Sequence, residues 1–198
     1  MSIIAINDRL GYIEASDDPL SADVGIIKTE GGVFLYDVGN GNKNASELAG
    51  EYNVVLSHFH ADHTGNIDRI KTRSLYVSAQ TYRHVNRGTV VRADICVNDV
   101  HIFSLPSSHT DGCLGLETRD GFAFVGDALY SKVKDGAYVY NAQLLKEEIE
   151  VIRALRAELL LVSHYKGMIR KKEDVINELL AIYALREKGT HEIRIQKK

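Results

Sequence analysis

Four side chains of types that bind metal ions lie within six consecutive residues of this sequence. They are His58, His60, Asp62 and His63, in the segment HFHADH. Because side chains alternate along an extended chain, His58 and His60 project to the same side. Imidazole nitrogens and carboxylate oxygens bind a divalent cation such as zinc at about 2.0–2.2 Å. Asp62 and His63 come where the chain turns and can face a neighbouring point, so the spacing suits two adjacent metal ions.

Three further candidate ligands stand where short apolar runs end, elsewhere in the chain. These residues are His109, Asp127 and His164. In layered α/β folds, functional side chains gather where buried strands release the chain. Two metal ions need more ligands than the HFHADH segment supplies, and we expect these three residues to complete the set.

The alternative interpretation is a polar loop that contains histidines by chance. It suits a lone histidine, and His84, His101 and His191 have no motif around them. Four potential ligands within six residues argue against it for the HFHADH segment. Cys113 follows His109 closely, but we interpret it as a small packed residue, since water activated by metal ions needs no cysteine nucleophile.

Strands mixed with helices must position these residues. Short β-branched and apolar runs predict strands, and apolar residues at helical spacing predict amphipathic helices. The predicted strands cover residues 10–15, 24–28, 33–38, 53–56, 75–77, 101–105, 114–117, 122–125 and 159–162, and the predicted helices cover residues 141–156 and 173–188. The pair Asp120-Gly121 predicts a hairpin turn, and Gly189 predicts the end of the last helix. The mixture of strands and helices indicates an α/β sandwich. Periodicity alone does not determine the order of the strands in it.

This pattern resembles the metallo-β-lactamase superfamily. The HxHxDH segment, a histidine after a proline-containing loop, a Gly-Asp pair after a strand and a final histidine occur in the family's order. Residues 34–39 (FLYDVG) are similar to its early strand-Asp-Gly element, and the resemblance covers about residues 33–167. In one departure, the common Pro-Gly-His approach is Pro106-Ser107-Ser108-His109 here.

The resemblance implies an α/β fold, a four-layer αββα sandwich over residues 1–198 as a single domain, with metal ions at one edge between the sheets. It implies that His58, His60 and His109 hold the first metal ion, that Asp62, His63 and His164 hold the second, and that Asp127 bridges both. Since Asp127 stands where some true lactamases use cysteine, the set is the version made only of histidine and aspartate. Two zinc ions are expected, and imidazole also suits iron or manganese.

Two bound divalent ions predict a metal-dependent hydrolase. Their four positive charges outweigh the two negative charges of Asp62 and Asp127, so a bridging water loses a proton near neutral pH. The hydroxide can attack a small ester-, thioester-, lactone- or phosphodiester-like substrate, with Asp62 as the catalytic residue that orients it and moves a proton. The candidate substrate-binding residues are Tyr165 and Lys166, with Tyr130, Tyr138 and Tyr140 as further candidates for the cleft.

Two other functions stay open. Persulfide-oxidising members of the superfamily bind one iron ion, so a mononuclear iron oxidoreductase of the persulfide dioxygenase type is the first alternative. A non-catalytic binding module is the second, although the complete ligand set argues against it. Roughly thirty residues follow Gly167, too few for the helical extension of the hydroxyacylglutathione hydrolases.

The composition is that of an ordinary globular protein. The 198 residues are 44% apolar and 26% charged, with a net charge of −3, which does not favour binding of nucleic acid by bulk charge. No apolar run approaches the roughly 18 residues of a membrane span, the N-terminus has no secretory pattern, and two cysteines make no disulfide framework. We expect a cytoplasmic protein with a small-molecule substrate and without membrane or nucleic-acid partners, and the oligomeric state is left open.

Overall fold

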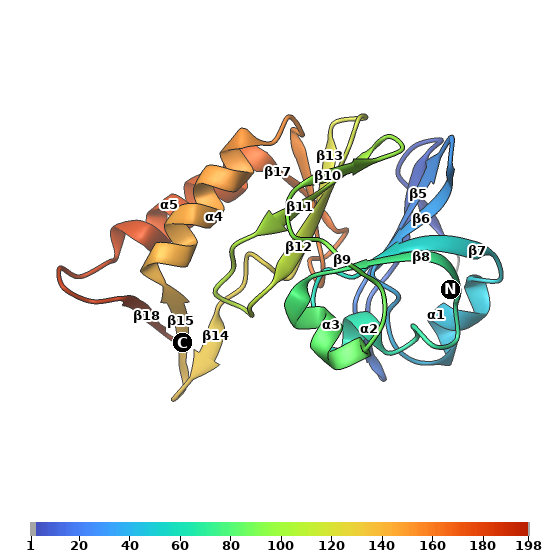
Figure 1. Cartoon of the computed structure of the whole chain (residues 1–198). Coiled ribbons are helices and arrows are strands. Elements are labelled where there is room, and N and C mark those ends of the chain that lie inside the picture. The colour runs from blue at the N-terminus through green and yellow to red at the C-terminus, as the bar shows by residue number, and fades with distance from the viewer. Residues whose placement is uncertain (1–2, 198) are drawn as a thin grey trace.

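Two facing β-sheets form the centre of the protein in the computed structural model, which describes residues 3–197 and, of residues 42–44, the backbone only (Figure 1). The first sheet has, in spatial order, β1 (Ile4–Ala5), β2 (Leu10–Ile13), β5 (Val24–Thr29), β6 (Gly32–Tyr36), β7 (Glu51–Val55), β8 (Lys71–Val77) and β9 (Thr89–Val90). The second has β10 (Ile95–Val97), β11 (Val100–Leu105), β12 (Cys113–Thr118), β13 (Phe122–Gly126), β16 (Leu159–Val162) and β17 (Ile169–Lys171).

Helices cover the outer face of each sheet. On the first sheet lie α1 (Asn42–Glu47), α2 (Ala61–Thr64) and α3 (Ala79–Val85), and on the second lie α4 (Ala142–Ala154) and α5 (Lys172–Ala184) (Figure 1). Two smaller sheets consist of β3 (Ser16–Asp17) with β4 (Leu20–Ser21), and of β14 (Lys132–Lys134), β15 (Ala137–Asn141) and β18 (Glu192–Gln196). None of the helices within residues 3–197 is long and apolar enough to cross a lipid bilayer.

Alternation along the strands explains why the layers stack in this order. In β13, Phe124 points into the core between the two sheets, whereas Ala123 and Val125 point into the core beneath α4 and α5. A third core lies under the helices of the first sheet and includes Leu48 and Ile67. Strands that are apolar on both faces are buried on both faces. The predicted four-layer αββα sandwich is therefore confirmed.

Parallel pairing brings the carboxyl ends of several strands to one edge. β7 pairs in parallel with β6 and β8 in the first sheet, and β13 pairs in parallel with β16 in the second. The two sheets approach closely at this edge. Gly126 has a φ of +55°, and a Cβ there would lie 2.9 Å from the Cβ of Ser57. Glycine suits both the conformation and the close approach.

All nine predicted strands and both predicted helices are present, with bounds that shift by a few residues. The largest shifts are of four residues: β8 begins at Lys71 rather than at residue 75, and the last helix ends at Ala184 rather than at residue 188. Gly189 instead lies in a turn closed by the hydrogen bond that Thr190 N donates to Glu187 O at 3.2 Å. The sheet of β14, β15 and β18 was not predicted.

Candidate metal centre

The HFHADH segment connects β7 to α2. His58 and His60 precede the helix, His60 is its N-cap residue, and Asp62 and His63 lie in the helix itself. The strand brings the chain to the edge between the sheets, and the short helix turns it back. Asp62 and His63 therefore face the edge from a different direction than His58 and His60.

The second sheet supplies the other three candidate ligands. His109 lies in the loop between β11 and β12, Asp127 directly follows β13, and His164 follows β16. His164 has a φ of +59°, and its backbone N–H donates a hydrogen bond to the buried carboxylate of Asp23 at 2.9 Å. That bond stabilises a backbone conformation which a non-glycine residue adopts at a cost.

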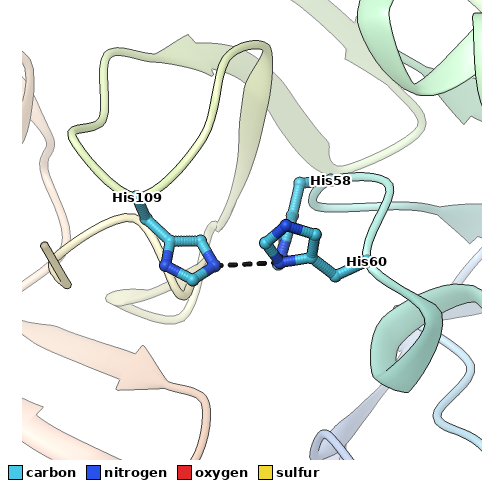
Figure 2. Close-up of side chains that lie close together, drawn as sticks. All are labelled: His58, His60 and His109. Carbon is cyan, nitrogen blue, oxygen red and sulfur yellow. Dashed lines mark hydrogen bonds between the residues drawn. The ribbon is translucent and has the colours of Figure 1, made fainter. Parts of the chain in front are cut away.

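Three imidazoles converge in the first donor group, which consists of His58, His60 and His109 (Figure 2). His60 Nδ1 lies 3.0 Å from His58 Nε2 and 3.0 Å from His109 Nε2. A single ring nitrogen carries at most one proton and cannot donate to both neighbours. Three lone pairs directed at one point are the arrangement that a divalent cation such as zinc requires.

The second donor group consists of Asp62, His63, Asp127 and His164, whose donor atoms lie within 4.8 Å of one another. His164 Nε2 lies 3.1 Å from Asp62 Oδ2. His63 Nε2 lies 3.5 Å from Asp62 Oδ2 and 3.4 Å from Asp127 Oδ2. Two carboxylates and two imidazoles thus surround one point.

Asp127 contacts both donor groups. Its Oδ2 lies 3.6 Å from His109 Nε2 in the first group, and 3.4 Å and 3.9 Å from the Nε2 atoms of His63 and His164 in the second. One carboxylate is therefore within reach of two neighbouring ions. The structure brings all seven predicted ligands together at one edge of the sandwich.

A buried carboxylate behind the ligands sets their tautomers. Asp37 Oδ2 lies 2.7 Å from His63 Nδ1 and accepts a hydrogen bond from Ser57 Oγ at 2.7 Å. Ser57 Oγ in turn lies 2.9 Å from His58 Nδ1. Since the hydroxyl proton of Ser57 goes to Asp37, its oxygen accepts the proton of His58 Nδ1. The Nε2 lone pairs of His58 and His63 are then left for a metal ion, one in each group.

The two groups differ in their charge. Burial lowers the pKa of His58 to about 2, and burial also lowers the pKa values of His60 and His109. In the second group, burial opposes the charged form of His63, but the carboxylates of Asp37 and Asp127 outweigh it and raise the pKa of His63 well above its ordinary value. The first group is a set of neutral donors, and the second attracts positive charge.

Asp62 and His164 reinforce that difference. The hydrogen bond to Asp62 raises the pKa of His164. Burial alone would raise the pKa of Asp62, but the hydrogen bond from His164 and the charge of His63 outweigh it and hold the pKa well below its usual range. The carboxylate of Asp62 therefore stays ionised at neutral pH.

Unpartnered buried atoms test whether this site fits metal ions. His63 Nε2 and Asp127 Oδ1 are buried and have no hydrogen-bond partner in the described part of the chain. Buried polar atoms are nearly always satisfied, and ion binding is one explanation for an exception. Both atoms belong to the second donor group. The donor types, their convergence and these two atoms all fit bound divalent cations.

The predicted substrate-binding residues lie on a separate flank of the site. Tyr165 and Lys166 are exposed and, with His164, line a cavity of about 250 Å³ that also includes Asp23 and Glu14. Tyr130, Tyr138 and Tyr140 line a different cavity, which reaches Asp127 and His109.

Sequence reasoning missed three residues that support the ligands. Asp37 lies in the segment that was noted only because it is similar to the family's early strand-Asp-Gly element. Its position near the end of a predicted strand was the signal that could have identified it. Ser57 precedes the first ligand and had no signal of its own. Asp23 contacts His164 from a position 141 residues away in the chain, so no local pattern could reveal it.

Comparison with known proteins identifies the fold. No protein-family model matches the chain, and no curated protein matches it in sequence. A solved subclass B3 metallo-β-lactamase with an active-site glutamic acid is 13% identical, with a TM-score of 0.67 over 91% of this chain and 89% of that chain. A metallo-β-lactamase from Hirschia baltica is 13% identical, with a TM-score of 0.68 over 92% of this chain and 97% of that chain.

A protein of another kind has the same fold. The chemotaxis sensor ODP, solved as a peroxy diiron species, is 16% identical, with a TM-score of 0.67 over 96% of this chain and 97% of that chain. This protein therefore has the metallo-β-lactamase fold, with a histidine and aspartate cluster fit for a metal site. The resemblance predicted from the sequence is confirmed at the level of the fold.

Proposed function

We propose that this protein is a hydrolase that binds two metal ions, zinc in the first instance, and cleaves a small ester-, thioester-, lactone- or phosphodiester-like substrate. The observation that carries the proposal is Asp127, whose Oδ2 lies within 3.6 Å of His109 in one donor group and 3.4 Å of His63 in the other. A carboxylate shared between two groups is typical of two-metal hydrolytic sites.

Each donor group has a separate part in the proposal. The proposed first site consists of His58, His60 and His109, and the proposed second site of Asp62, His63 and His164, with Asp127 between them. When bound, the two cations would acidify a water molecule and polarise the carbonyl or phosphoryl oxygen of the substrate. Asp37, acting through His63 and through Ser57, holds one imidazole of each site in the tautomer that binds a cation.

Asp62 is the proposed catalytic residue. Because its carboxylate is ionised, Oδ2 can accept a proton from the nucleophile, and His164 Nε2 at 3.1 Å fixes its orientation. We keep Tyr165 and Lys166 as proposed substrate contacts on the flank of His164. We also propose a cytoplasmic setting, because Cys96 and Cys113 are both free thiols.

Elemental analysis of protein purified without added metal, followed by a substrate panel, tests the proposal. The panel contains thioesters, lactones, phosphodiesters and a cephalosporin. We expect about two zinc ions per chain and hydrolysis that chelation abolishes. One iron ion per chain, together with oxidation of a sulfur substrate, would contradict the hydrolase.

An iron-dependent function is the second candidate, and the similarity to the diiron sensor ODP favours it. Imidazole and carboxylate ligands bind iron as well as zinc. Two iron ions per chain, with an absorption change on exposure to oxygen and no hydrolysis, would support this candidate over the first.

A further inference from the structure

A cavity of about 510 Å³ opens beside the second donor group. Its volume lies in the range of small-molecule sites, which are mainly apolar with a few convergent polar groups. One side of the cavity carries the candidate metal donors His109, Asp127 and His164. The other side is mainly apolar and carries Tyr130, Val133 and Tyr138. Whatever binds in this cavity contacts the proposed metal centre directly.

The hairpin of β14 and β15 makes the apolar side. Val133 and Tyr138 are a cross-strand pair in this hairpin, so their side chains lie on the same face. Tyr140 is two residues further along β15, lies on that face as well, and also lines the cavity. Lys132 and Lys134 alternate with Val133 and line a neighbouring cavity of about 580 Å³ next to His60.

Val133 and Tyr138 are exposed although they are apolar, with 59% and 38% of their surface accessible. Scattered exposed apolar residues are common and need no explanation. These two form a pair and face a cavity whose opposite side is a cluster of metal-binding residues. Tyr130 is fixed nearby, because its hydroxyl donates a hydrogen bond to Ser163 O at 2.7 Å.

We infer that this cavity binds an aromatic substituent of the substrate, for example of an ester or thioester with an aromatic ring next to the scissile bond. Aromatic rings pack on tyrosine rings in offset or edge-to-face pairs. The inference rests on the proposed hydrolase function. Hydrolysis places the hydroxyl of water on the acyl carbon and its proton on the departing alcohol or thiol.

Equilibrium binding of 2-naphthoate to zinc-loaded protein tests the cavity without turnover. The chain has no tryptophan, so naphthoate fluorescence reports binding directly. We expect naphthoate to bind at least about tenfold more tightly than acetate, because both carry a carboxylate and only one carries rings. Equal affinity of the two ligands would overturn the inference.

Variants of the hairpin locate the binding. Tyr138→Ala and Val133→Ser should each weaken naphthoate binding about tenfold and leave acetate binding unchanged. Tyr82→Ala is the matched control, since Tyr82 is 40% exposed on α3, and it should change neither affinity. Thermal melting verifies that each variant is folded. Unchanged naphthoate affinity in both hairpin variants would place the ligand elsewhere and overturn the inference.

Hydrolysis assays separate this inference from the proposed function. Benzyl acetate tests a ring on the leaving group, because benzyl alcohol and methanol leave about equally well, and methyl phenylacetate tests a ring on the acyl group. We expect at least one of them to be preferred over methyl acetate, with the preference lost in Tyr138→Ala. Hydrolysis without any such preference would overturn the aromatic site and leave the hydrolase intact. Tight naphthoate binding without any hydrolysis would overturn the hydrolase and leave the aromatic site intact.

Discussion

The metal centre and the inner face of α4 both bury ionisable side chains, and they surround them in opposite ways. In the metal centre, the buried carboxylate of Asp37 contacts Ser57 and His63. On α4, Glu148 is fully buried, and neither of its oxygens has a hydrogen-bond partner among residues 3–197. Its neighbours on the same helix face, Leu145 and Ile149, belong to the apolar core.

The two regions therefore hold their carboxyl groups in different states. Partners keep Asp62 ionised, whereas burial alone raises the pKa of Glu148 well above its ordinary value. A buried polar group without partners costs about 1–3 kcal/mol. Burial of an ionisable group does not by itself indicate a functional site. Burial together with convergent partners does, and the four predictions below test that distinction.

Asp62→Asn should have the largest effect. The variant keeps the size of the side chain but removes the negative charge of a proposed ligand and the proposed proton acceptor, so turnover should fall by about 100-fold or more. The measurement is kcat for the best substrate at equal metal occupancy. His84→Ala is the control, because His84 stacks on Phe59 outside both donor groups, and it should stay within a few-fold of the wild type. Equal turnover in Asp62→Asn and in the wild type would exclude this role for Asp62.

Removal of the bound metal ions should have the second-largest effect. A ligand at 100 times its dissociation constant stabilises a fold by about 2.7 kcal/mol, which for a chain of this size shifts the melting temperature by roughly 5–10 °C. We expect chelation to lower the melting temperature by that amount and added zinc to restore it. An unchanged melting curve after verified removal would show that the metal centre does not need its ions for stability.

Asp37→Asn should weaken metal binding by about 10–100-fold, the range typical of residues that orient metal ligands. The amide can still accept a hydrogen bond from His63, but the negative charge behind the imidazole is lost. Competition with a chromophoric chelator measures the affinity. Asp68→Asn is the matched control, since the side chain of Asp68 is 87% exposed. Equal affinities in both variants would mean that Asp37 has no special part.

Glu148→Met should raise the free energy of unfolding by about 1–3 kcal/mol at neutral pH. Because burial raises the folded pKa of Glu148 above the ordinary value of 4.5, this side chain destabilises the fold least below that pH, and its cost grows as pH rises. The difference between the variant and the wild type should therefore widen from acidic to alkaline pH. Denaturant unfolding across pH measures it, and a constant difference would contradict burial of a neutral carboxyl group.

Most of the fold follows from local patterns. β13 and β16 carry apolar side chains on both faces, which predicts buried strands whatever their neighbours. β14 and β18 gave no such signal. β14 is three residues long and fully exposed, so it has no buried face to produce a period. β15 pairs with β18 across about fifty residues of chain, and no local pattern encodes that pairing.

The donor types and their order along the chain were determined by the sequence itself. Histidine and aspartate at HxHxDH spacing, followed by three polar residues at strand ends, predict a metal site because few other environments bring these groups together. Only the tertiary structure decided which atoms meet. The packing of two sheets places Asp127 between His109 and His63, and Asp23 against His164. Those contacts join residues far apart in the chain, and their distances depend on how the sheets pack against each other, which local periodicity does not encode.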